Sequence, residues 1–144
     1  MEIATMGKIL VPVRLENVYD LHETSLGGRA AEAVRRVDVN DALVDTGAST
    51  LSVPKRLVAQ LGLKPLRTRQ ARTSGGPVTL QVYGTVRLTV QGRDCTCDVI
   101  ELPDDCPVLI GQVPLELLDF VIDPSGQRLI GNPAHGGEHI IELY

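Results

Sequence analysis

Alternation of apolar and polar residues with a period of two constrains the fold of this chain most. It is clearest from Val78 to Val90, where every second residue is apolar except Gly84. A period of two indicates strands with one buried face. The same reasoning predicts strands over residues 8–15, 34–39, 42–45, 68–73, 95–102, 108–111, 121–123, 128–130 and 139–144. Helices are predicted only over 53–63, with Ser52 as the N-cap, and over 114–120. This is too little helix for a βαβ sheet, so we expect an all-β fold.

Two connections in the first third of the chain are predicted from polar and glycine residues. Asn40-Asp41 reads as a tight turn between two strands, and residues 17–33 read as a loop with a short helical turn. A chain of 144 residues is expected to form one domain, 1–144, and its few aromatic residues predict an aliphatic core.

Charge and cysteine content exclude several classes of function. Residues 1–72 carry a net charge of +3 and residues 73–144 a net charge of −7, with no basic stripe, so we expect no nucleic-acid partner. The apolar run Ile9–Val13 is too short for a signal peptide or a membrane span. We therefore expect no membrane partner. Three cysteines without a CxxC pattern predict free thiols, no metal or other cofactor, and a cytoplasmic location. The run 135–139 is read either as a metal site or as a flexible tail.

Asp45 is the main candidate for chemistry. The apolar residues 42–44 lead directly to Asp45 at a Thr46-Gly47 turn. A carboxylate at the end of a hydrophobic strand is poorly solvated, which raises its pKa, and a second carboxylate nearby raises one pKa of the pair further. Such a group can take part in acid–base chemistry. The alternative is a turn aspartate that accepts hydrogen bonds from its own backbone.

Two further features accompany this turn. Alternating segments flank Ser74-Gly75-Gly76-Pro77, which predicts a glycine-tipped hairpin over about 67–84. The apolar run Val108-Leu109-Ile110-Gly111 precedes the second predicted helix. Together, in this order, the three features resemble the retropepsin-like (retroviral-type) aspartic proteases over about residues 8–131, in particular the small bacterial members. The resemblance implies a closed β-barrel with a glycine-tipped flap and one or two short helices, assembled as a homodimer.

The resemblance also implies an activity and residue roles. The chain is expected to be an aspartic endopeptidase that hydrolyses peptides or proteins with Asp45 as the catalytic residue. Its single Asp-Thr-Gly requires an Asp45 from each of two subunits. The implied supporting residues are Thr46, Gly47 and Ala48 in the active-site turn at 45–48, Ser49, Ser74, Gly75 and Gly76 against the substrate, and a dimer strand at about 139–144.

The sequence departs from the retroviral pattern at two positions. Ser49 stands where retroviral enzymes have a second aspartate, and Gln112 stands where they have its arginine partner. This leaves open a non-catalytic retropepsin-like domain for dimerisation or peptide binding. The long segment at 17–33 also allows a precursor that needs self-processing. The alternating arginines 67, 69 and 72 are read either as a preference for acidic substrates or as a solvated strand face.

Overall fold

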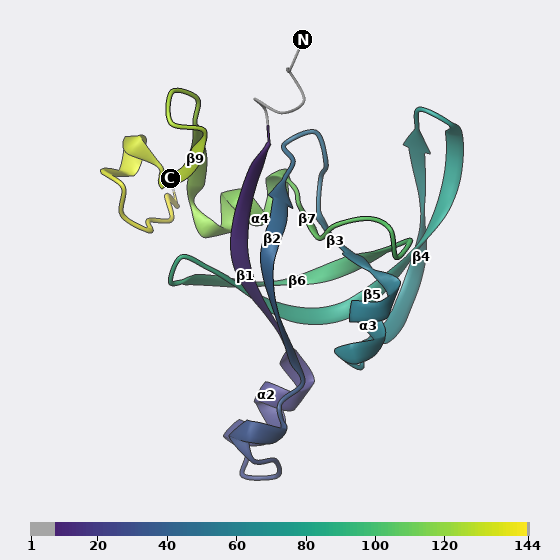
Figure 1. Cartoon of the computed structure of the whole chain (residues 1–144). Helices are drawn as coiled ribbons and strands as arrows, with labels where there is room; N and C mark the ends of the chain where they lie inside the picture. Colours follow the sequence, from purple (N-terminus) through teal and green to yellow (C-terminus); the bar gives the residue numbers. More distant parts are fainter. Residues whose placement is uncertain (1–7, 144) are drawn as a thin grey trace.

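The computed structural model describes residues 8–143 and is built mainly from β-strands (Figure 1). The all-β prediction is therefore confirmed. The strands are β1 (Ile9–Asn17), β2 (Arg36–Val44), β3 (Leu51–Pro54), β4 (Lys64–Thr73), β5 (Gly76–Val90), β6 (Arg93–Leu102), β7 (Leu109–Ile110), β8 (Phe120–Asp123) and β9 (Arg128–Gly131). The helices are α2 (Val18–Ser25), α3 (Lys55–Gln60) and α4 (Gln112–Leu118), with short 3-10 helices at Ala31–Ala33 and Pro133–His135.

Seven strands form one sheet in the order β1-β2-β7-β3-β6-β5-β4, and β8 and β9 form a separate hairpin. β1 pairs with β2 and, through residues 14–17, also with β5. The short strand β7 runs parallel to β2 and antiparallel to β3. Because β7 lies between them, it joins the strand that precedes Asp45 to the strand that follows the Asp45 turn.

The core is aliphatic, as expected from the scarcity of aromatic residues. Its largest fully buried side chains are Leu15, Leu51, Leu61, Leu88, Ile110 and Leu118. Each buried leucine or isoleucine contributes about 1.5–3 kcal/mol relative to an exposed one. Cys95, Cys97 and Cys106 are all free, as predicted.

The predicted tight turn at Asn40-Asp41 is wrong, because β2 continues without a break from Arg36 to Val44. Opposite this point the register shifts, so that Val11 pairs with Ala42 and Val13 with Val39. β2 thus holds one residue more than β1 between these two pairs, which is a β-bulge. Pro12 lies opposite the bulge and has no N–H to donate, so a regular ladder could not continue there.

Two helix predictions need correction. Residues 17–33 contain α2, a helix of eight residues, which is more than the single turn expected. α3 begins at Lys55, so Ser52 lies in β3 and does not cap the helix. Pairing of β3 with both β6 and β7 keeps residues 51–54 in the sheet and buries Ser52. Gly62, with φ +64°, follows the last turn of α3 as predicted.

The two predicted hairpins are present. β4 and β5 meet at a two-residue turn, Ser74-Gly75, and β8 and β9 meet around residues 124–127. The strand predicted for 139–144 does not form in the single chain, because residues 139–143 lie outside both sheets. Tyr144 lies outside the described residues.

Candidate active site

Asp45 lies directly after β2, and backbone hydrogen bonds on both sides hold it in place. Its N–H donates to the Ile110 carbonyl at 2.9 Å, which extends the β2–β7 ladder by one residue. Its own carbonyl accepts from the Ala48 N–H at 3.0 Å, and this bond closes the turn. The Gly47 N–H donates to Asp45 Oδ1 at 3.0 Å, a bond that is also expected for a turn aspartate. One carboxylate oxygen is thereby oriented by the backbone of its own turn.

The N-terminus of α4 holds the other side of this turn. The N–H groups of Gly111, Gln112 and Val113 donate to the carbonyls of residues 50, 48 and 49, each at 2.9 Å. The first N–H groups of a helix have no partner within the helix, so they are free to bind these carbonyls. The loop that carries Asp45 is therefore fixed to α4 by three hydrogen bonds.

Gly111 is required by the close approach of the two segments. A Cβ at this position would lie 2.5 Å from the Thr50 carbonyl oxygen, 2.6 Å from the Thr50 nitrogen and 2.7 Å from the Ala48 carbonyl oxygen. No side chain fits there without moving the backbone next to Asp45. This explains in physical terms why the apolar strand at 108–110 has to end in glycine.

The turn is accessible in the single chain. Asp45 and Ala48 are half-buried, whereas Thr46, Gly47 and Ser49 are exposed. The sequence predicted a poorly solvated carboxylate, but the single chain leaves Asp45 in contact with solvent. Among the described residues, none donates a hydrogen bond to Asp45 Oδ2 and no cation lies within ion-pair distance of Asp45. The chemistry that the isolated turn offers is that of one oriented, solvent-facing carboxylate.

The hairpin tip is built from Thr73 to Gly76. Thr73 Oγ1 donates to the Gly76 carbonyl at 2.8 Å and accepts from the Gly75 N–H at 3.2 Å. Gly76 has φ +109°, a value that L side chains rarely adopt. Ser74 and Gly75 are exposed at the end of the hairpin. In Figure 1 the tip and the loop that follows β2 lie toward the same end of the molecule, opposite α2.

Ser49 and Gln112, the two described residues that depart from the retroviral pattern, form no hydrogen bond with each other. Gln112 Nε2 donates to Glu116 Oε1 at 3.2 Å, one turn later on α4. The Ser49 side chain is exposed, and its backbone carbonyl accepts from Val113. The pair therefore leaves no buried charge without a partner.

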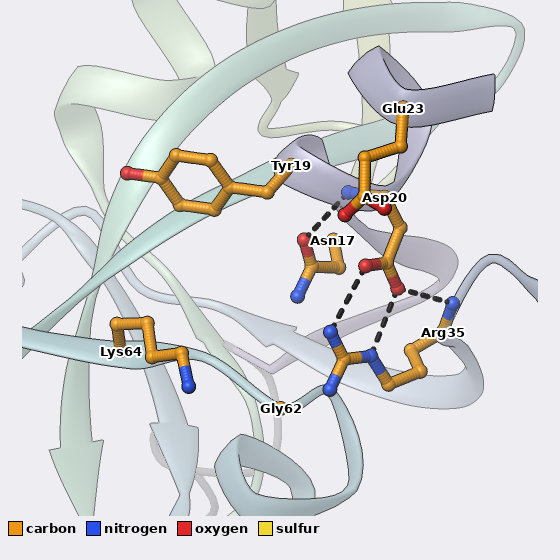
Figure 2. Close-up of a pocket in the computed structure, with 7 residues that line it drawn as sticks. All are labelled: Asn17, Tyr19, Asp20, Glu23, Arg35, Gly62 and Lys64. Atoms are coloured by element: carbon orange, nitrogen blue, oxygen red, sulfur yellow. Dashed lines mark hydrogen bonds and ion pairs between the residues drawn. The ribbon is translucent and has the colours of Figure 1, made fainter. Parts of the chain in front are cut away.

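A cavity of about 250 Å³ lies at the other end of the molecule, beside α2 (Figure 2). Asp20 is fully buried there, with a side-chain exposure of 0 %. Its carboxylate accepts from Arg35 Nε, from Arg35 NH2 and from the Arg35 backbone N–H, each at 2.9 Å. These bonds, the side-chain pair first, lower the pKa of Asp20 to about 2 despite its burial. Asn17 caps the helix by accepting from the Asp20 N–H, so this cluster anchors α2 to the sheet.

The run 135–139, which the sequence left open between a metal site and a flexible tail, is attached by separate contacts. His135 Nδ1 lies 2.6 Å from Asp119 Oδ2, which also accepts from the Ile140 N–H at 3.1 Å. The hydrogen bond with Asp119 raises the pKa of His135. His139 Nε2 lies 3.1 Å from the Leu117 carbonyl instead. Within residues 8–143 no three His, Cys, Asp or Glu side chains gather as a metal site would require.

The Asp45 turn, its support by an apolar-apolar-glycine strand and the glycine-tipped hairpin are together typical of an aspartyl protease. A sequence model described as aspartyl protease matches residues 23–113, which is more than half of the chain. The chain therefore belongs to the retropepsin-like aspartyl protease family, as the sequence resemblance predicted. The match spans Asp45, the β4–β5 hairpin and Gly111 but ends before β8. Among curated proteins, none matches this chain.

The sequence analysis missed the N–H groups of Gly111, the residue before α4, and of the first two residues of α4, which bind residues 48–50. Backbone donors leave no pattern of side chains. Gly111 was the available signal, since it ends the apolar strand at the point of contact. On the question of membranes, no helix within residues 8–143 combines the length and the apolar character that a membrane span needs.

Proposed function

We propose that this chain is an aspartic endopeptidase that acts as a homodimer. In the proposed reaction, a water molecule activated by two Asp45 carboxylates, one from each subunit, hydrolyses a peptide bond. The observation that carries the proposal is the Asp45 turn itself. Backbone bonds on both sides fix it, and its carboxylate has one oriented oxygen and one that the described residues leave open.

The sequence contains no second Asp-Thr-Gly that could supply the partner carboxylate. Asp123, in Asp123-Pro124-Ser125-Gly126, is the nearest match in the sequence, but it lies in the separate β8–β9 hairpin. Its Oδ1 accepts from Ser125 Oγ at 2.8 Å and from the Ser125 N–H at 3.1 Å, as in an ordinary turn aspartate. A twofold axis at the Asp45 turn supplies the partner, because each residue near such an axis meets its own copy.

The two carboxylates divide the work of one hydrolysis. The ionised group takes a proton from water, whose oxygen attacks the carbonyl carbon, while the protonated group donates a hydrogen bond to the carbonyl oxygen. When the C–N bond breaks, the leaving amine takes a proton from the pair. The shared proton belongs to the pair and not to one residue, and it stays there because two close carboxylates resist double ionisation.

Other features of the chain support the arrangement. The pairing of β1 with both β2 and β5 supports a closed barrel within a single domain, 1–144. The glycine-tipped hairpin at about 67–84 suits a flap that closes over a peptide or protein substrate. For the dimer, the chain presents apolar side chains on α4 and the C-terminal segment: Val113 (50 % exposed), Leu117 (49 %), Ile140 (44 %), Ile141 (78 %) and Leu143 (80 %).

The decisive variant is Asp45→Asn. Asparagine keeps the acceptor for the Gly47 N–H, so we expect the fold and dimer to persist while cleavage of a peptide library, read by mass spectrometry, is lost. Asp41→Asn is the matched control, because Asp41 is exposed on β2 and loses the same charge. Retained cleavage by the Asp45→Asn protein contradicts the mechanism.

A second experiment tests whether the two subunits share the site. Specific activity should fall on dilution, together with the dimer fraction measured by sedimentation. Specific activity that stays constant at concentrations where only monomers are found contradicts the shared site.

The second candidate is a non-catalytic domain for dimerisation or peptide binding. Ser49 and Gln112 favour it, because the charged pair that retroviral enzymes place next to the active-site turn is missing. Peptide binding without turnover, unchanged in the Asp45→Asn protein, is the result expected for this alternative. Cleavage by the unmodified chain rules it out.

A further inference from the structure

The face of the sheet on which Asp45 lies can be followed by strand register. Leu43 and Asp45 are two residues apart, so their side chains lie on the same face. Residues that pair directly across two strands also share a face. From Leu43 the row passes through the pairs Leu43–Leu109, Leu109–Ser52, Ser52–Ile100 and Ile100–Val82. This row leads from the Asp45 turn across β7, β3 and β6 to β5.

The row continues onto the hairpin and separates its three arginines. Val82 pairs with Arg67, and Leu80, two residues further toward the tip, pairs with Arg69. Arg67 and Arg69 therefore lie on the Asp45 face. Arg72 pairs with Pro77 and lies on the opposite face. The three arginines that are close in the sequence therefore lie on two different faces of the hairpin.

Only one of the two arginines on the Asp45 face has a carboxylate partner among the described residues. Arg67 NH2 lies 2.9 Å from Asp98 Oδ2, so its charge is already matched. Arg69 is exposed and forms no ion pair within residues 8–143. Its neighbours on the same face of β5 are Leu80, which is half-buried, and Val78, which is 37 % exposed. Arg69 is therefore an unmatched cation beside apolar side chains.

We propose that Arg69 makes the enzyme prefer substrates with an aspartate or glutamate at one position near the cleaved bond. The acidic side chain would pair with the Arg69 guanidinium while its neighbours in the peptide contact Val78 and Leu80. A guanidinium binds a carboxylate through two parallel hydrogen bonds, and a closed hairpin that excludes water strengthens them. This inference rests on the proposed peptidase function, which it deepens by naming the substrate class.

The test compares peptides that differ only by glutamate or glutamine at each position around one cleavage site. At the position that meets Arg69, we expect kcat/KM to favour glutamate by about 10-fold, equivalent to about 1.4 kcal/mol. In the Arg69→Gln protein, which still cleaves the glutamine peptide, the ratio of the two kcat/KM values should fall toward 1. The preference for glutamate should also weaken as salt is raised, because the pair is partly exposed.

Arg72→Gln is the matched control, because it removes the same charge from the same strand on the opposite face. For the Arg72→Gln protein, the ratio of kcat/KM for the glutamate peptide to kcat/KM for the glutamine peptide should equal the ratio measured for the unmodified enzyme. The inference is overturned if the Arg69→Gln protein keeps the preference for the glutamate peptide. It is also overturned if the Arg72→Gln protein loses this preference to the same extent as the Arg69→Gln protein. Arg69→Glu should instead favour a lysine-containing peptide at the same position.

A binding measurement separates this inference from the proposed catalysis. The same peptides, labelled with a fluorophore, are titrated with the Asp45→Asn protein and binding is followed by anisotropy. A preference for glutamate that disappears with the additional Arg69→Gln change supports the Arg69 site even if no peptide is cleaved. Equal binding of the two peptides contradicts the Arg69 site whether or not the unmodified chain proves to be a peptidase.

Discussion

Replacing Asp20 by asparagine should destabilise the fold far from the Asp45 turn. The change removes a fully buried carboxylate that accepts three hydrogen bonds from Arg35 and lies 3.4 Å from Arg29 NH2. The shift of the Asp20 pKa from 3.8 to about 2 corresponds to about 2 kcal/mol of stability at neutral pH. Asparagine also turns an amide NH₂ toward the guanidinium, so we expect a total loss of about 3 kcal/mol.

The sign of the pH dependence follows from the lowered pKa of Asp20. A carboxylate that is more acidic in the folded state stabilises the fold above its unfolded pKa of 3.8, and this contribution disappears as pH falls toward about 2. The difference in the free energy of unfolding between the unmodified and Asp20→Asn proteins should therefore be largest at pH 7 and shrink between about pH 4 and pH 2. The difference that remains at low pH reflects the altered hydrogen bonds.

Urea unfolding followed by circular dichroism measures this difference. With a slope of about 2 kcal/mol per molar urea, a loss of about 3 kcal/mol lowers the midpoint by about 1.5 M at pH 7. Asp38→Asn is the matched control, because Asp38 also pairs with an arginine through two bonds, to Arg14, but is 60 % exposed. That pair should contribute less than about 1 kcal/mol. Equal losses in the two variants, or a loss at Asp20 that does not change with pH, would refute the argument from burial.

Two further predictions concern α4 and the segment after it. Gly111→Ala forces a methyl group into backbone atoms of Thr50 and Ala48, so its thermal midpoint and any peptidase activity should drop sharply; Gly28→Ala, where the nearest atom to the new Cβ is 3.6 Å away, should change neither. His135→Gln should reduce stability at pH 6 and have little effect at pH 9. The raised pKa of His135 means that its charged form stabilises the fold below about 6.5 and that this contribution is lost as pH rises through the folded value. Thermal unfolding of His135→Gln and of His22→Gln, an exposed control on α2, at both pH values tests this, and a loss at His135 that is equal at pH 6 and pH 9 contradicts it.

The sequence predicted those parts of the fold that depend on local alternation. Val78 to Val90 reads as a strand because its even-numbered residues are apolar, and the structure places Val86, Leu88 and Val90 in the core. The register shift between Tyr83 and Val86, which the sequence did not predict, puts Val82 on the opposite face, the face of Asp45. The contact between Gly47 and Asp45 was also predictable, because it spans only two residues. Such features carry their own signal in a short window of sequence.

Features that depend on distant partners were not predictable in this way. Ser52 has the chemistry of a helix cap, but pairing with β6 and β7 keeps it in a strand. Asn40 and Asp41 are typical turn residues, yet they form a bulge because Pro12 lies opposite. α2 depends on an ion pair between Asp20 and Arg35, fifteen residues apart. A strand at 139–143 needs a neighbouring strand, and none of residues 8–138 provides one.

The location of α2 offers a practical use for labelling. It closes the β1–β2 hairpin at the end remote from the loop after β2 (Figure 1). The loop after the helix contains Gly27 and Gly28, both exposed. Exposed loop tips of this kind accept insertions more readily than other parts of a domain. An epitope or fluorescent reporter inserted between these two glycines would therefore lie well away from the Asp45 turn and should leave it unchanged in imaging or pull-down experiments.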